Sequence, residues 1–377
     1  MTSLPYIQAS TTKRGISPPH LLTSITPTPP PPLAPSPPQH SNQTMNNSIA
    51  LPIVEPSQAG EARRMALAFA SRLGFNETER GKVGLVVTEV ANNLVRHAQD
   101  GVILLQALEN NGIAGVEILA LDKGPGIDNL SECLRDGFST AGTPGNGLGA
   151  VTRLSAFFDI YSVPTVGTAI LSHLWASPLP VNQPQENLKL GAVCLPIRGE
   201  EVSGDTWASD RTDNHSLLLV ADGLGHGPQA AKASLEAVRV FRENVRCSPQ
   251  EIMAAAHAAL RSTRGAAVAI AAIDFECQTV LFAGIGNISG TIFSPDGSCN
   301  MVSYNGTVGH EVRKIKEFTY PWSQGSLLIM HSDGLATQWR LDRYAGLITR
   351  HPSLIAGVLY RDFNRGRDDV TVLVAKG

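Results

Sequence analysis

The sequence lacks a long hydrophobic run. No apolar stretch approaches the roughly 20 residues that a helix needs to span a bilayer. It also lacks an excess of one charge, since the net charge is only -3. Proteins that bind nucleic acid through phosphate contacts usually carry a basic surface. We therefore expect neither a membrane nor a nucleic acid as a partner.

Cysteine is scarce and shows no pairing pattern. The five cysteines are odd in number, and no two of them form a Cys-X-X-Cys pair. This argues against both a zinc site and a disulfide framework, and it is typical of a reducing compartment. We expect a cytoplasmic protein.

Acidic residues are absent from the first 48 residues, where 11 of the 25 prolines lie. A segment of this composition favours polyproline II conformation and cannot build a packed core. We expect residues 1–48 to form a disordered, Pro-rich tail. Ordered patterning begins directly behind Met45, so the sequence leaves open whether translation starts at Met1 or at Met45.

Behind this tail, the length of 377 residues allows two or three domains. Regular hydrophobic patterning occupies residues 49–175 and residues 188–377. The segment between them, residues 176–187, is rich in Pro, Asn and Gln. It predicts a flexible linker, which would hold two domains close without fixing their geometry.

The second patterned stretch contains aspartates at the ends of predicted strands. The apolar run 217–221 ends in Asp222 and Gly223, and three more acids adjoin runs of strand length: Asp205, Asp333 and Asp368. Four converging carboxylates would repel one another unless cations lay between them. Oxygen ligands favour Mg²⁺ or Mn²⁺ over zinc. These residues predict a two-metal hydrolase, although Asp-Gly after a strand is also an ordinary turn.

The first patterned stretch contains a helix pattern that begins after Asn76. Glu89 and Asn93 are four residues apart and therefore share one helix face. Such a face could hold Mg²⁺ with a water or hydroxyl beside it, or it could simply be exposed to solvent. We expect the opposite side to pack through Leu85, Val86, Val90 and Leu94.

Two glycine-rich segments follow that helix. In DKGPG, Asp122 is acceptor-only and suits the exocyclic amine of adenine. Gly124 and Gly126 would let the backbone approach a ligand closely. The second segment, GNGLGA, precedes a helix whose N-terminal N–H groups would suit phosphates, or it is a flexible hinge. Its glycines are Gly145, Gly147 and Gly149.

In this order, EVANN, DKGPG and GNGLGA resemble the GHKL ATP-binding fold, and within it the anti-sigma serine kinases of the RsbT and SpoIIAB kind. The resemblance covers residues 49–175 and implies ATP as a ligand. It implies that Asn93 binds Mg²⁺, that Asp122 holds adenine, and that Glu89 takes the proton from a substrate serine.

The segments VADGLGHG, HSDGL and DDVTVLV resemble the metal-dependent PPM-type serine/threonine phosphatases, in their SpoIIE and RsbX branch. The resemblance implies that Asp222 bridges two metals, assisted by the Gly223 carbonyl. Asp205 would serve one metal, and Asp333 and Asp368 the other. A water made acidic by both cations would attack phosphoserine. No phosphate-binding arginine is evident, and His226 is either the proton donor or a turn residue.

Together the resemblances predict an α+β chain of two domains, a GHKL (Bergerat) α/β sandwich followed by a PPM-type αββα sandwich. They imply a bifunctional regulator of a bacterial partner-switching pathway, with serine kinase and phosphoserine phosphatase activities toward STAS-domain proteins. A sigma factor is a second candidate partner. In the alternative, the first domain is a non-catalytic ATP-binding module that sequesters a partner or senses nucleotide.

Overall fold

The computed structural model describes residues 48–130, 147–180, 187–212, 215–295 and 297–377. Residues 42–377 belong to one compact unit. Apart from Ser48, the predicted Pro-rich tail lies outside the described residues, as do the central part of the predicted linker and Gly145. We refer below to an N-terminal region (residues 48–180) and a C-terminal region (residues 187–377).

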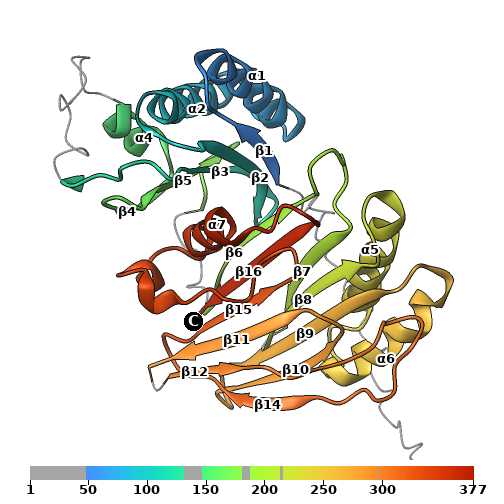
Figure 1. The fold of residues 1–377 in the computed structure, drawn as a ribbon. Coiled ribbons are helices and arrows are strands. Elements are labelled where there is room, and N and C mark those ends of the chain that lie inside the picture. Colours follow the sequence, from blue (N-terminus) through green and yellow to red (C-terminus); the bar gives the residue numbers. More distant parts are fainter. Residues whose placement is uncertain (1–47, 131–146, 181–186, 213–214, 296) are drawn as a thin grey trace, which may run out of the picture. The chain divides into compact units, whose positions relative to one another are not determined.

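The N-terminal region is a two-layer α/β sandwich. Its five-stranded antiparallel sheet has the order β1-β2-β3-β5-β4. In the described part of this region, three helices lie on one face of the sheet (Figure 1). The strands are β1 (Ile49–Pro52), β2 (Val102–Asn110), β3 (Ile113–Leu121), β4 (Phe157–Val163) and β5 (Gly167–Trp175). The helices are α1 (Pro56–Arg72), α2 (Glu77–His97) and α4 (Gly147–Leu154).

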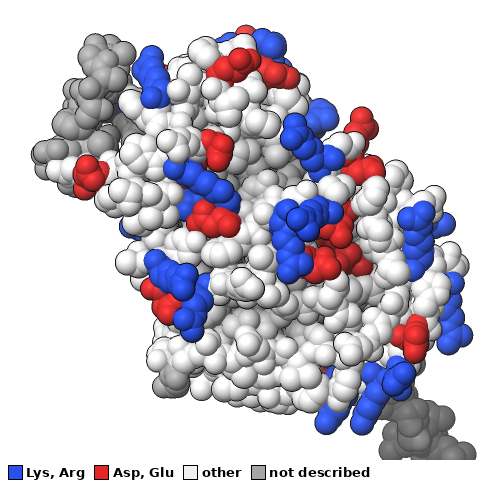
Figure 2. Space-filling model, in the orientation of Figure 1, with Lys and Arg blue, Asp and Glu red and all other residues white. Residues whose placement is uncertain are grey.

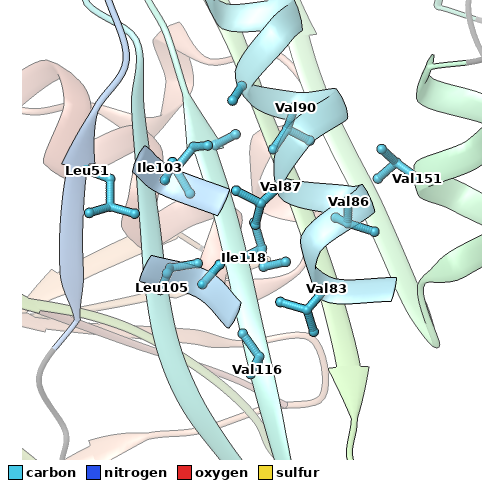
Figure 3. Packing of buried hydrophobic residues seen from close by; sticks show 14 of the residues in the cluster. Leu51, Val83, Val86, Val87, Val90, Ile103, Leu105, Val116, Ile118 and Val151 are labelled. Carbon is cyan, nitrogen blue, oxygen red and sulfur yellow. The ribbon is translucent and has the colours of Figure 1, made fainter. Parts of the chain in front are cut away.

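Helix α2 is amphipathic and begins where the sequence indicates. The side chain of Asn76 accepts a hydrogen bond from the backbone N–H of Glu79, which satisfies one free donor of the first turn. Val83, Val86, Val87 and Val90 recur every three or four residues and pack on Ile103, Leu105 and Ile118 of the sheet (Figure 3). One expectation is wrong, because Leu85 is 52% exposed and belongs to the outer face.

The C-terminal region consists of two packed sheets. One has the order β13-β10-β9-β8-β7, with β14 paired to β10, and the other has the order β12-β11-β15-β16-β6. The first sheet contains β7 (Asp205–Arg211), β8 (His215–Gly223), β9 (Ala266–Asp274), β10 (Thr279–Ile285), β13 (Ser303–Tyr304) and β14 (Phe318–Pro321). The second contains β6 (Lys189–Leu195), β11 (Ser289–Ser294), β12 (Gly297–Asn300), β15 (Leu327–His331) and β16 (Val370–Lys376).

Helices cover both outer faces of this pair of sheets. The helices α5 (Pro228–Glu243) and α6 (Pro249–Ala259) pack on the β7–β10 sheet, and α7 (Pro352–Phe363) packs on the β6–β16 sheet. Between the sheets, buried apolar residues such as Val220 and Met330 form a further core. The described residues of this region also include three short 3₁₀ helices: Leu260–Ser262, Leu341–Arg343 and Leu347–Thr349. This arrangement confirms the predicted αββα sandwich.

Helix α7 is buried on more than one side. Every residue from Pro352 to Leu359 is buried, which is typical of a helix that is covered all round. Its apolar residues share one core with β16 and with residues of β3 and β5 from the N-terminal region (Figure 1). At the closest approach, a Cβ on Gly357 would lie 2.6 Å from Cδ2 of Leu119. The two regions therefore share a core, and the predicted linker is not their only connection.

Among the described residues, none of the helices combines the length and the apolarity that crossing a bilayer requires.

Candidate functional site

Helix α2 brings together two of the predicted nucleotide-site residues. Glu89 and Asn93 are partly buried and face the start of α4. A Cβ on Gly147 would lie 3.1 Å from Oε2 of Glu89 and 3.8 Å from Oδ1 of Asn93. A Cβ at this position would be a tight contact for Glu89, and glycine leaves space beside both polar groups. Gly149, two residues further along, is buried within the same short helix. The prediction that these glycines precede the helix is therefore wrong for Gly147 and Gly149, which form its first turn.

Asp122 lies at the end of β3, where it is 9% exposed. Its Oδ1 accepts hydrogen bonds from the backbone N–H groups of Gly124 (2.7 Å) and Thr168 (3.3 Å). Burial raises the pKa of this carboxyl, and the two hydrogen bonds oppose that rise. The carboxylate is thus held in place by the chain itself.

The glycines of the DKGPG segment allow close packing of backbone. A Cβ on Gly124 would lie 2.7 Å from the carbonyl oxygen of His97, at the end of α2. Gly126 has a φ of +74° and approaches the carbonyl of Val163 in the same way. These contacts hold the end of β3 close to the end of the Asn93 helix.

The four predicted metal ligands lie on neighbouring strand ends of the C-terminal region. Asp205 begins β7 and Asp222 ends the neighbouring β8, and the strand register places the two directly opposite each other. Asp333 follows β15, and Asp368 precedes β16, which pairs with β15. We call these residues the acidic cluster: Asp205, Asp222, Asp333 and Asp368.

The members of the acidic cluster lie close enough to affect the pKa values of one another. Burial raises the pKa of Asp222 to about 9, and repulsion from the other three cluster members and from Asp369 contributes. Burial likewise raises the pKa of Asp205 to about 7. A side-chain hydrogen bond with Ser332 lowers this pKa, and repulsion from Asp369 raises it. Neighbouring acids therefore oppose the ionisation of both carboxyls.

The acidic cluster fits divalent cations. Within the described residues, Oδ2 of Asp205 is buried and has no hydrogen-bond partner, which is costly for a carboxylate oxygen. An all-oxygen set of ligands suits Mg²⁺ or Mn²⁺. The backbone of Gly223 lies at the end of β8, next to Asp222, and a Cβ on Gly223 would clash with Ala230.

Asp369 has a different environment from its neighbour Asp368. Its Oδ1 accepts from the N–H of Ile197 and its Oδ2 from the N–H of Gly204, both at 2.7 Å. Both oxygens are therefore engaged in holding the loop that leads into β7. The structure favours a positioning role for Asp369.

Two polar residues near the acidic cluster were missed by the sequence reasoning. Asn287 donates from Nδ2 to Oδ2 of Asp333 at 2.7 Å. Arg264 brings its Nη1 to 3.3 Å from the position that a Cβ on Gly225 would occupy, so a guanidinium lies beside the loop after Asp222. His226, in the same loop, is exposed and pairs with Glu200 at 2.8 Å.

A further polar cluster joins the start of α7 to the N-terminal sheet. Oε2 of Glu117 lies 2.8 Å from Nε2 of His173 and accepts from the hydroxyl of Ser353 at 2.7 Å. Nδ1 of His351 accepts from the N–H of Ser353 at 3.2 Å. The ligand atoms of Glu117, His173 and His351 lie within 4.8 Å of one another. Because these groups already satisfy one another, hydrogen bonding accounts for the cluster without a metal.

The surface carries mixed charge. On the face that Figure 2 presents, Lys and Arg lie interspersed with Asp and Glu. No large area of one sign is visible on that face, in agreement with the net charge of -3.

Comparisons with known proteins divide the chain in the same way. Residues 54–171 match the family described as Histidine kinase-like ATPase domain, and residues 212–377 match the family described as Stage II sporulation protein E (SpoIIE). The Serine/threonine-protein kinase RsbT of Bacillus subtilis (strain 168) is 33% identical over 131 residues, which cover 35% of this chain and 98% of RsbT. The Phosphoserine phosphatase RsbX of the same organism is 31% identical over 139 residues, which cover 36% of this chain and 69% of RsbX.

A crystal structure of RsbX in complex with magnesium aligns at 23% identity with a TM-score of 0.46, over 52% of this chain and 97% of that one.

Proposed function

Because the chain belongs to the RsbT-like ATPase family in its first half and to the SpoIIE phosphatase family in its second, we propose that it is a bifunctional regulator of protein serine phosphorylation. The C-terminal region would remove phosphate from a phosphoserine, and the N-terminal region would transfer phosphate from ATP to a serine. The proposed targets are STAS-domain proteins of a bacterial partner-switching pathway. A sigma factor is a second candidate partner.

The phosphatase assignment rests above all on the acidic cluster. Two divalent cations held there, Mg²⁺ or Mn²⁺, would supply positive charge that acidifies water and neutralises phosphoryl oxygens. Asp222 would bridge the pair with help from the Gly223 carbonyl, Asp205 would serve one cation, and Asp333 and Asp368 the other. Asn287 orients Asp333, and Asp369 holds the loop before β7 in place.

Arg264 is our candidate for the phosphate contact that the sequence did not reveal. Arg264 is exposed, and its guanidinium lies beside Gly225. Gly225 follows Asp222 closely in the chain. A guanidinium at the rim of an acidic site can donate two parallel hydrogen bonds to the oxygens of a phosphoserine. His226 faces Glu200, and this pairing favours a role in shaping the loop over proton donation.

The kinase assignment rests on the contact between α2 and the start of α4. Glu89 would accept the proton of the substrate serine, and Asn93 would bind Mg²⁺ at the phosphates. Asp122, held by two backbone N–H groups, would accept a hydrogen bond from the adenine amine. Gly124, Gly126, Gly145, Gly147 and Gly149 would let the backbone approach the nucleotide. Such a set positions the reactants and neutralises charge, which is what phosphoryl transfer chiefly needs.

The test is to incubate the full chain with candidate STAS-domain proteins and to follow their phosphorylation by mass spectrometry. With Mg²⁺ and ATP, the Asp222→Asn variant should accumulate phosphoserine on a target, because only the kinase remains. With Mn²⁺ and no ATP, the Glu89→Gln variant should remove phosphate from a phosphorylated target. Retention of phosphate in the second reaction would contradict the phosphatase assignment. Absence of phosphorylation in the first, with nucleotide bound, would favour a non-catalytic ATP-binding module.

A further inference from the structure

Arg361, on α7 of the C-terminal region, reaches the nucleotide site of the N-terminal region. Its Nη1 donates to the backbone carbonyl oxygen of Asp122 at 2.9 Å. Its Nε and Nη2 donate to the two carboxylate oxygens of Asp362, each at 2.8 Å. The Arg361 side chain is 3% exposed, so this guanidinium is buried, paired and held in one orientation.

The residue that lies against this arginine must be glycine. Gly167 has a φ of +126°, and a Cβ there would lie 2.8 Å from Nη1 of Arg361 and would clash with the carbonyl of Asp122. The next residue, Thr168, donates its N–H to Oδ1 of Asp122. The carboxylate of Asp122 is therefore held by backbone N–H groups of the N-terminal region, and its carbonyl oxygen is held by Arg361 of α7.

The other end of this connection reaches the acidic cluster. Directly after α7, the N–H of Arg365 donates to the carbonyl of Gly334 at 2.9 Å, and the carbonyl of Phe363 accepts from the N–H of Ala336 at 2.9 Å. Gly334 follows Asp333 in the chain. A Cβ on Gly334 would clash with the carbonyl of Asp369, the neighbour of Asp368. The end of α7 is thus hydrogen-bonded to the segment that carries Asp333, and that segment packs against the one that carries Asp368.

We propose that Arg361 is a positioning residue that links the two sites, so that nucleotide bound at Asp122 changes the affinity of the acidic cluster for divalent cations. This inference rests on the proposed function, because it takes Asp122 as a nucleotide ligand and the acidic cluster as a cation site. Any movement of Asp122 moves the acceptor of Arg361, and α7 carries that displacement to Asp333 within a few bonded contacts. By thermodynamic linkage, cations at the cluster must change nucleotide affinity by the same factor.

A second arginine provides a matched control. Nη1 of Arg350 donates to Oδ1 of Asp159 at 3.2 Å and so also joins the C-terminal region to the N-terminal sheet. It lies before α7, and its partner Asp159 belongs to β4, away from the end of β3. Loss of this contact removes a connection between the regions without touching Asp122.

The test is isothermal titration of the full chain with a non-hydrolysable ATP analogue, with and without Mn²⁺. Mn²⁺ also binds the nucleotide directly and can change its dissociation constant in that way. The Asp333→Asn variant, which lacks a proposed ligand of the acidic cluster, measures this background. Beyond that background, the wild-type dissociation constant should change by about fivefold or more, in the range usual for coupled sites. Lysine cannot reproduce the forked contact of Arg361, so in Arg361→Lys the change in dissociation constant caused by Mn²⁺ should fall close to the background. In Arg350→Gln this change should equal that of wild type.

Each outcome is decisive. A wild-type change equal to that of Asp333→Asn overturns the inference, and so does a full change in folded Arg361→Lys. Thermal melting shows whether Arg361→Lys is folded. If it is not, the comparison of wild type with Asp333→Asn still tests whether the two sites are coupled. If the analogue binds and Asp122→Ala abolishes that binding, a missing Mn²⁺ effect refutes the linkage alone. If wild type binds no analogue, the proposed nucleotide site itself is wrong and the linkage falls with it.

Discussion

The two candidate sites satisfy their buried acids in opposite ways. Asp122 in the N-terminal region already receives two backbone hydrogen bonds on its carboxylate. In the acidic cluster, by contrast, Oδ2 of Asp205 has no partner among the described residues, and burial and mutual repulsion raise the pKa of Asp222 to about 9. The carboxylate of Asp122 therefore has hydrogen bonds before any ligand binds, whereas the acidic cluster is under electrostatic strain that cations would relieve.

The largest effect is expected from Asp222→Asn. Removing the bridging carboxylate should lower phosphoserine hydrolysis by a factor of about 10³, because each cation supplies several kcal/mol of charge stabilisation. Without cations the variant should melt at the same temperature as wild type or higher, since a repelled carboxylate is gone. Melting curves and release of phosphate from a phosphoprotein measure both effects.

The control for that variant is Asp210→Asn, on the same strand as Asp205 but near its other end. It should leave both the rate and the response to EDTA unchanged. Hydrolysis that survives Asp222→Asn, or that EDTA leaves intact, would rule out a two-cation site.

In the N-terminal region, Glu89→Gln should separate binding from chemistry. Phosphoryl transfer to serine should fall by about 10²-fold or more, as is usual for the loss of a general base. Affinity for the ATP analogue should stay within a factor of about two, since the amide keeps the size of the side chain and its proposed role exists only in the reaction. Single-turnover transfer and titration calorimetry provide the two numbers. Equal transfer by the variant and wild type would refute the base assignment.

A smaller effect, on the free energy of unfolding without any ligand, distinguishes Asp122 from the acids of the acidic cluster. Asp122→Ala should lower the free energy of unfolding by about 1–3 kcal/mol, because the N–H groups of Gly124 and Thr168 lose their acceptor. Asp205→Ala, in cation-free protein, should cost less. The variant loses the hydrogen bond from Ser332 but also removes a buried carboxyl that neighbouring acids repel and whose Oδ2 has no partner among the described residues. Urea unfolding in EDTA measures both. A larger loss for Asp205→Ala would reverse the proposed contrast.

The last of these predictions concerns the pH dependence of stability at the polar cluster at the start of α7. Burial and the neighbouring His173 lower the pKa of His351 to about 4, from 6.5 in the unfolded chain, while Glu117 and Asp159 oppose that shift and Lys189 adds to it. As pH falls below 6.5, the unfolded chain takes up a proton that the folded chain refuses, so stability is lost between about pH 6.5 and 4. We expect a loss of about 2 kcal/mol.

Glu117 acts in the same direction in more acidic solution. Burial raises its pKa, but the hydrogen bond and charge of His173 outweigh this and hold the pKa below 4.5. Its contribution is therefore lost as pH falls through that lower value. His351→Asn keeps an acceptor for the N–H of Ser353 without the titration and should flatten the pH dependence between 6.5 and 4. An unchanged slope in urea unfolding would contradict this account.

Much of the acidic cluster could be predicted from the sequence, because an aspartate next to an apolar strand pattern marks a strand end. The same holds for Glu89 and Asn93, whose spacing of four residues places them on one helix face. In both cases the signal is local. The error at Leu85 is also local, since several residues of α2 are apolar and the limits of its buried face are set by the partner sheet.

What the sequence could not predict are contacts between distant parts of the chain. Arg361 and Asp122 are 239 residues apart, and Ser353 and Glu117 are 236 apart. The apolar run in α7 indicates a buried helix but does not reveal what covers its second side. Arg264 has no motif around it, and only the fold brings it beside Gly225.

The measurement that tests the central claim most directly is titration of the metal-free chain with Mn²⁺ near pH 7, in buffers of different ionisation enthalpy. With a pKa of about 9 for Asp222 and about 7 for Asp205, cation binding must displace protons from the acidic cluster. Two ions should bind per chain and about one proton or more should be released, and both numbers should be lower in Asp222→Asn. Binding without proton release, or equal release from the variant, would contradict it.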